Sequence, residues 1–92
     1  MPKWEVCRIQ YRLVKRRGIF SPAKYKWCAI VDTQNGEEII DASIEIEDHD
    51  DARNVLLQNE EASKLTGRLL AKGWEPMESS YGRVSVLKRH VA

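Results

Sequence analysis

Apolar and polar residues alternate along the first third of the chain, with the period that a half-buried β-strand requires. Between Trp4 and Val14 the odd-numbered positions carry most of the apolar side chains, and a second alternating segment runs from Tyr25 to Asp32. Each segment is therefore expected to be a strand that turns one face to the core. The residues expected on the core face are Cys7, Ile9, Tyr11, Leu13, Tyr25, Trp27, Ala29 and Val31.

The dipeptide Asn35-Gly36 predicts a tight hairpin after the second strand, because both residues accept the positive φ of a type I′ turn. A two-residue loop between Gln34 and Glu37 would fix the pairing with a third strand. That register sets Val31 opposite Ile40, Ala29 opposite Ala42, Trp27 opposite Ile44, Tyr25 opposite Ile46, Lys26 opposite Glu45 and Lys24 opposite Glu47. Continuing the apolar face onto the first strand sets Ile9 opposite Trp27, Tyr11 opposite Tyr25, and Cys7 opposite Ala29.

Residues from Asp50 to Lys72 carry apolar side chains at the three- and four-residue spacing of an amphipathic helix. These apolar positions are Ala52, Val55, Leu56, Ala62, Leu65, Leu69 and Leu70. One unbroken helix is the preferred interpretation, and a restart at Asn59, an acceptable cap residue, is the alternative. Gly73 is expected to end the helix in the left-handed conformation, and Trp74 to open the next strand with its indole in the core.

Two short strands are expected after the helix, at residues 74–77 and 83–89, with a turn at residues 79–82 between them. Pro76 cannot donate a hydrogen bond to a ladder, so the first of these strands is expected at an edge. The residues expected to face the core from the second strand are Val84 and Val86.

The whole pattern predicts a single α+β domain over residues 1–92, with the order β-β-β-α-β-β. Its antiparallel sheet has the second strand between the first and the third, and one helix packs on one face. A hydrophobic share of 42 % with 32 % charged residues is typical of a soluble globular domain. No apolar run approaches the ~20 residues that cross a bilayer, and two cysteines are too few for a secreted disulfide framework. We therefore expect a cytoplasmic protein without membrane contact.

The residues that most often carry metal or catalytic chemistry form no recognised motif. Cys7, Cys28, His49 and His90 lack the paired spacing of zinc ligands, and the two cysteines fall on opposite strand faces, which also disfavours a disulfide. The acidic run at residues 45–51 lacks the glycine and the glutamate of a calcium-binding loop, and is better explained by helix capping and charge pairing. A non-enzymatic protein with no cofactor and no metal is expected.

One face of a sheet covered by a single helix stays open, and apolar side chains are expected to gather at one end of it. They are Trp4, Val6, Cys28, Ile30 and Ile39. The predicted register sets Trp4 opposite Asp32, Val6 opposite Ile30, and Asp32 opposite Ile39. Because gathered apolar side chains on a surface mark interfaces, self-association as a homodimer, or binding of a protein partner, is the favoured function. Frayed strand ends or a covering C-terminal strand would explain the same residues without a partner.

The net charge of +1 conceals an alternation of +7 over residues 1–30, −10 over residues 31–62 and +4 over residues 63–92. The basic first segment supports an alternative function, the binding of single-stranded nucleic acid. The candidate contacts are Arg8, Arg12, Lys15, Arg16 and Arg17. Glu45 and Glu47 are expected to neutralise two lysines on the same face, which makes this the second choice.

The two ends of the chain carry short motifs. They are Trp4-Glu5, the helix end from Leu69 to Gly73 followed by Trp74-Glu75, and Leu87-Lys88-Arg89. In these motifs the chain resembles a class of small bacterial domains of unknown function, which open with a Trp-Glu strand and close with helix, Gly-Trp-Glu and strand. The resemblance covers about a third of the chain. It implies the fold and transfers no activity.

Overall fold

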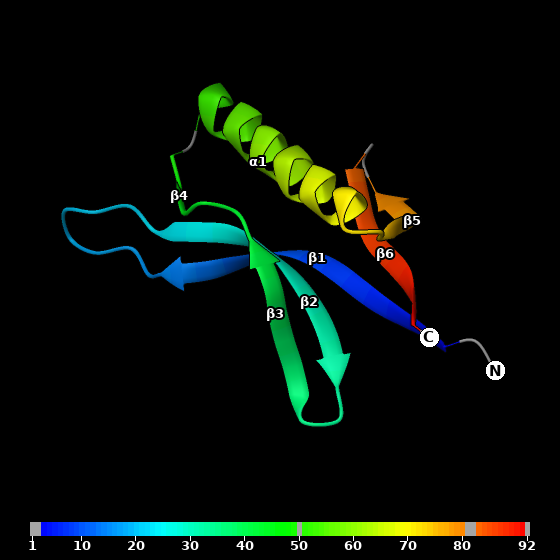
Figure 1. The fold of residues 1–92 in the computed structure, drawn as a ribbon. Helices are drawn as coiled ribbons and strands as arrows, with labels where there is room; N and C mark the ends of the chain where they lie inside the picture. The colour runs from blue at the N-terminus through cyan, green and yellow to red at the C-terminus, as the bar shows by residue number, and fades with distance from the viewer. Residues whose placement is uncertain (1–2, 50, 81–82, 92) are drawn as a thin grey trace.

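The computed structural model describes residues 3–49, 51–80 and 83–91, which form an antiparallel sheet and one long helix (Figure 1). The strands follow the spatial order β3-β2-β1-β6-β5, and a short strand, β4, also pairs with β2. The bounds are β1 Lys3–Lys15, β2 Lys24–Thr33, β3 Gly36–Ala42, β4 Ile46–Glu47, α1 Ala52–Ala71, β5 Glu75–Ser80 and β6 Arg83–Val91. The predicted α+β class is therefore confirmed, as are the order of elements and the place of the second strand. The expected third strand is divided into β3 and β4.

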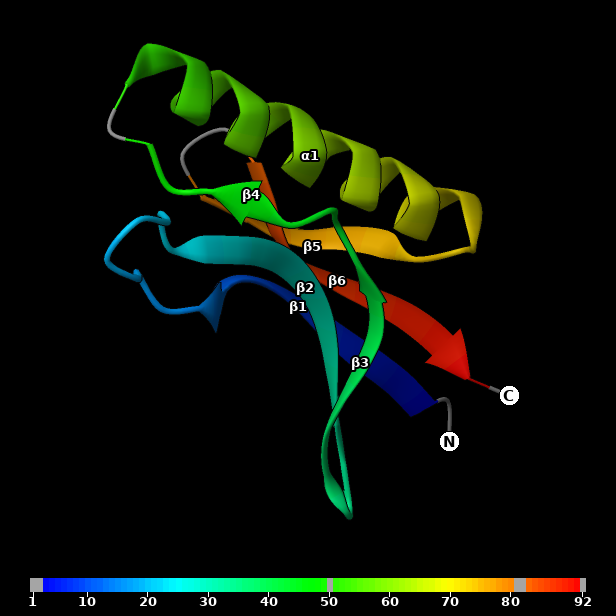
Figure 2. The same ribbon diagram turned by 90° about the vertical axis from the view of Figure 1, so that its left-hand side faces the viewer.

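The helix α1 lies across one face of the sheet (Figure 2), and the core fills the space between them. The core residues are Cys7, Ile9, Trp27, Ala29, Val31, Ile46, Ala62, Leu65, Leu69, Trp74 and Leu87. The preferred single helix is confirmed, with Asp51 as its N-cap. The Asp51 carboxylate accepts a 3.0 Å hydrogen bond from the main-chain N–H of Asn54. Part of the predicted apolar stripe is wrong, because Val55, Leu56 and Leu70 are exposed.

Gly73 ends the helix as predicted, with a φ of +93°. The amide of Trp74 then donates a 3.1 Å hydrogen bond to the carbonyl of Leu69, which turns the chain back toward the sheet. This reversal places the Trp74 indole in the core, where it is 2 % exposed. Gly73 and Trp74 thus have a structural role, which is to join the helix to β5.

At the tip of the β2–β3 hairpin the strand pairing is displaced by two residues from the prediction, and the two-residue loop by one. The loop residues are Gln34 and Asn35, and Thr33 pairs with Gly36, whose φ of +111° favours glycine. Val31 consequently lies opposite Glu38, not Ile40. A bulge beside Ala29 and Ile30, and the break between β3 and β4, place extra residues in the third segment. In the middle of the strand Ala29 lies opposite Asp41, not Ala42. At β4 the prediction is correct, with Tyr25 opposite Ile46 and Lys24 opposite Glu47.

The β1–β2 pairing is also displaced by two residues from the prediction. Ile9 lies opposite Ala29, Tyr11 opposite Trp27, and Cys7 opposite Val31. A two-residue displacement leaves every side chain on its predicted face. It moves the first residues of β1 past the end of β2. Along its other edge β1 pairs with β6, which sets Trp4 opposite His90 and Val6 opposite Lys88.

The C-terminal strands complete the sheet on the far side of β1. The strand β5 with Pro76 is at the edge, as predicted. Leu87 is fully buried, whereas Val86 pairs with Arg8 and does not belong to the core, so the expected core role of Val86 is wrong. Irregular pairing around Glu78 changes which residues of β6 face the core. Residues 81–82 of the predicted turn lie outside the described part of the chain.

The molecule is elongated, with extents of 53 × 29 × 19 Å and a radius of gyration of 14.6 Å. A compact chain of this length would have a radius of gyration of about 12 Å. Figure 1 shows the cause: the β1–β2 loop and the β2–β3 hairpin both extend away from the helix-covered part of the sheet.

Candidate interface on the open face of the sheet

The predicted interface residues divide into two groups in the structure. Trp4, Val6 and Ile39 are exposed, at 49 %, 42 % and 49 % of their surface. Cys28 and Ile30 lie on the same open face but are 1 % and 0 % exposed. The expected exposure of Cys28 and Ile30 is therefore wrong, and the apolar surface of this face comes from the other three residues.

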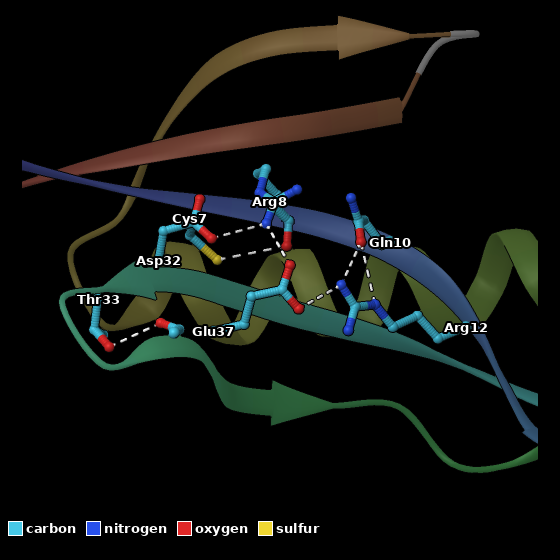
Figure 3. Close-up of polar contacts among 8 residues, drawn as sticks. Cys7, Arg8, Gln10, Arg12, Asp32, Thr33 and Glu37 are labelled. Carbon is cyan, nitrogen blue, oxygen red and sulfur yellow. Dashed lines mark hydrogen bonds and ion pairs between the residues drawn. The ribbon is translucent and has the colours of Figure 1, made fainter.

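Long charged side chains explain why Ile30 is buried without a covering helix. In the register Ile30 lies between Arg8 of β1 and Ile39 of β3. Arg8 Nη2 is 3.0 Å from Glu37 Oε1 and also 3.0 Å from Asp32 Oδ1. Because Glu37 belongs to β3, this ion pair spans the middle strand on its open side (Figure 3). The aliphatic parts of such side chains exclude water from the residues beneath them.

Arg12 extends the same network along β1. Its Nη2 donates a 2.9 Å hydrogen bond to Glu37 Oε2, and its Nε and Nη2 donate to Gln10 Oε1 at 3.1 and 2.8 Å. Glu37 thus binds one arginine with each carboxylate oxygen. The network of Arg8, Arg12, Asp32 and Glu37 contains two cations and two carboxylates, so its formal charge is zero; we call it the Glu37 network.

The electrostatics of the Glu37 network follow from these contacts. Hydrogen bonds from Arg12, and then from Arg8, lower the pKa of the Glu37 carboxyl. The hydrogen bond to Glu37 likewise raises the pKa of Arg8. One donor is left over, because Arg8 Nε is buried and has no hydrogen-bond partner among the described residues.

Trp4 lies near the start of β1 and is held on the open face by residues of β6. Its ring meets the His90 ring edge-on, with centroids 5.2 Å apart. The Lys88 ammonium lies 4.7 Å from the centre of the Trp4 ring, a cation–π contact. These contacts fix the indole on the sheet while about half of it stays exposed.

The residues predicted to contact nucleic acid also form two groups, one engaged in ion pairs and one exposed. Arg8 and Arg12 are engaged by the Glu37 network, whereas Lys15, Arg16 and Arg17 are exposed at the end of β1 and in the following loop. That loop also presents Ile19 and Phe20, which are 93 % and 99 % exposed. Sequence reasoning assigned no role to Ile19; its position between a basic run and Ser21-Pro22 was the available signal.

Acidic residues form a separate cleft of about 490 Å³ beside the start of the helix. Its lining residues are Glu45, Glu47, His49, Asp51, Arg53, Asn54 and Leu57. Among the described residues, no group of three or more His, Cys, Asp or Glu side chains is arranged to hold a metal ion. Cys7 and Cys28 are both free and buried, which agrees with the disulfide being disfavoured, and burial raises the pKa of the Cys7 thiol.

Comparison with family models, with curated proteins and with solved structures found no match to the chain. The resemblance to small bacterial domains therefore stays a prediction. Within the described residues no helix has the length and apolar character to cross a membrane.

Proposed function

We propose that the chain is a non-enzymatic module that associates with a second copy of itself through the open face of the sheet. The observation that carries this proposal is the exposure of Trp4, Val6 and Ile39 on a face that no helix covers. Half-exposed aromatic and aliphatic side chains that are fixed in place lose little conformational entropy on binding. The larger extents of 53 and 29 Å leave room for the ~800 Å² that each partner of a standard interface buries.

The Glu37 network supports the same proposal. Its two arginines are already bound to two carboxylates, so covering the network leaves none of its own charges uncompensated. The proposal places the protein in the cytoplasm, where two free thiols remain reduced.

Trp4 gives a direct test, because Trp27 and Trp74 are 8 % and 2 % exposed and contribute little to quenching by a solute in water. We expect the acrylamide-accessible fraction of tryptophan fluorescence to rise when the protein is diluted from about 100 µM to about 1 µM, as Trp4 leaves the interface. A Trp4→Phe variant should lose this dependence on concentration. An accessible fraction that stays constant in the wild-type protein over this range would contradict the proposal.

A further inference from the structure

The ribbon formed by the end of β1, the loop that follows and the start of β2 is strongly basic. We call residues 12–26 the basic arm. Its cations are Arg12, Lys15, Arg16, Arg17, Lys24 and Lys26, and the sequence has no Asp or Glu between Glu5 and Asp32. Figure 1 shows that the tip of this arm projects beyond the helix-covered part of the sheet.

The register of the arm sets like charges directly opposite one another. Arg12 pairs with Lys26, and an irregularity after Leu13 brings Lys15 opposite Lys24. Like charges at opposite positions of a sheet destabilise it, so this arrangement favours a polyanion as the partner. Glu47 lies opposite Lys24 on the other side, but its carboxylate Oε2 is 2.9 Å from His49 Nε2. Among the described carboxylates, none forms an ion pair with Lys15, Lys24 or Lys26.

The tip of the arm presents two apolar side chains in a closed turn. The Gly18 amide donates a 3.0 Å hydrogen bond to the Ser21 carbonyl, which leaves Ile19 and Phe20 at the apex. A Cβ on Gly18 would lie 2.7 Å from Ser21 Oγ, so a larger residue there would require the Ser21 hydroxyl to move. At 93 % and 99 % exposure, the Ile19 and Phe20 side chains contribute almost nothing to the fold.

We propose that the basic arm binds duplex nucleic acid, with its lysines and arginines on the phosphates and Ile19 and Phe20 inserted as a wedge at a base step. Double-stranded DNA presents about one negative charge per 1.7 Å of axis, which suits cations spaced along a ribbon. Apolar side chains at the tip of a basic element are the wedges that partly unstack a duplex step. Duplex binding by the basic arm does not require self-association through the open face.

A duplex fits the arm better than a single strand does. Binding of single strands relies on several exposed aromatic rings as stacking platforms. Phe20 is the one described aromatic residue at the tip. Tyr25 is stacked on Tyr11, with ring centroids 5.1 Å apart, and Tyr11 packs against the core. Trp4 is at the opposite end of β1.

A membrane surface fits less well, because the cations are spread along the arm. From Arg17 back to Arg12 the chain covers about 17 Å at roughly 3.4 Å per residue. The attraction of an anionic lipid surface decays over a Debye length of about 8 Å at physiological salt. Cations at the base of the arm would therefore gain little from lipid headgroups, whereas phosphates of a duplex can extend alongside them.

Fluorescence anisotropy with a labelled duplex of about 20 base pairs, and with a single strand of equal length, tests the proposal. Five cations of the arm are outside the Glu37 network, so log K should fall with log salt at a slope of about −4.5 per arm. The triple variant Lys15→Gln, Arg16→Gln, Arg17→Gln should reduce the slope to about −2. The matched control Arg53→Gln, Lys64→Gln, Lys72→Gln loses the same charge from the helix region and should leave the slope unchanged.

A separate variant tests the insertion of Phe20 into the duplex. Phe20→Ala should weaken duplex binding about tenfold at fixed salt without changing the slope, because an inserted side chain contacts a base step and no phosphate. Circular dichroism should be unchanged, because Phe20 is exposed. The proposal is overturned by the absence of duplex binding at low salt, by equal slopes in the two triple variants, or by tighter binding of the single strand. Flotation with phosphatidylserine vesicles, in the absence of duplex binding, would assign the arm to a membrane instead.

Discussion

The indole Nε1 of Trp27 donates a 2.9 Å hydrogen bond to the main-chain carbonyl of Gln58. Trp27 belongs to β2, and Gln58 to the helix, so this bond sets where the helix crosses the sheet. The Arg83 guanidinium lies 4.8 Å from the centre of the same ring, and the Tyr11 ring packs on it with centroids 4.8 Å apart. Because the helix makes few other polar contacts with this part of the sheet, we expect the Trp27–Gln58 hydrogen bond to contribute strongly to holding the helix in place.

The substitution Trp27→Phe removes the hydrogen bond and part of a buried ring. We expect the free energy of unfolding to fall by about 2–3 kcal/mol. Urea denaturation followed by far-UV circular dichroism measures the change. A loss below about 0.5 kcal/mol would show that this bond does not hold the helix on the sheet.

Tyr11→Phe in the same aromatic cluster should behave differently. Within the described part of the chain the Tyr11 hydroxyl is buried without a hydrogen-bond partner, and burial raises the pKa of that phenol. Removing an unsatisfied polar group relieves its desolvation cost, so the free energy of unfolding should stay the same or rise by up to about 1 kcal/mol. Urea denaturation again serves as the measurement, and a clear loss of stability would mean that the hydroxyl has a partner in solution.

The same substitution should have opposite effects at two glycines of the helix region. Gly67 lies inside the helix, and an added Cβ would meet nothing within 4 Å, so Gly67→Ala should stabilise by about 0.5–1 kcal/mol. Gly73 also has space for a Cβ, but its φ of +93° strains an L-residue, so Gly73→Ala should destabilise by about 1–2 kcal/mol. Thermal denaturation of both variants tests the pair. Shifts of the same sign would contradict the assigned end of the helix.

Glu37→Gln should change how stability depends on pH. The bonds from Arg12 and Arg8 make the pKa of Glu37 lower in the folded chain than in the unfolded chain. The carboxylate therefore stabilises the fold above its ordinary pKa of about 4.3, and this contribution is lost as the pH falls through the lower folded value. We expect a shallower acid-induced loss of stability in Glu37→Gln than in the wild type, measured by urea denaturation at a series of pH values.

Asp41→Asn serves as a comparison for that measurement. Its pKa is also lowered, chiefly by the hydrogen bond from Arg68, so this variant should lose a separate part of the acid dependence. The contribution of Glu37 should remain in Asp41→Asn. Identical pH profiles for Glu37→Gln and the wild type would show that the Glu37 network is absent in solution.

Side-chain patterns predicted the elements of this fold and the faces of β1 and β2, but not the alignment of the strands. The alternation around Ile9 and Trp27 fixes which face each residue occupies, and a displacement of two residues leaves that pattern unchanged. The bulge beside Ile30 has no residue type that marks it. The faces of β1 and β2 could therefore be predicted, whereas pairs such as Val31 with Glu38 could not.

The candidate interface was predicted in part for a related reason. Parity placed Ile30 on the open face correctly, and its burial depends on how far Arg8 and Glu37 reach across a neighbouring strand. That reach depends on the register and on side-chain conformation, neither of which the sequence alone specifies. Ile19 was missed because an apolar pair in a loop, Ile19-Phe20, has no periodicity to reveal it.

Sedimentation equilibrium on three proteins tests the central claim most directly. The wild-type chain of 10.6 kDa should shift toward twice that mass as its concentration rises. Val6→Lys with Ile39→Lys should remain monomeric, because both charges would be buried in the interface. The control Leu56→Lys with Leu70→Lys changes equally apolar, exposed residues of the helix and should associate like the wild type. A wild-type protein that stays at monomer mass, or a control that dissociates as fully as the sheet variant, would contradict self-association through the open face.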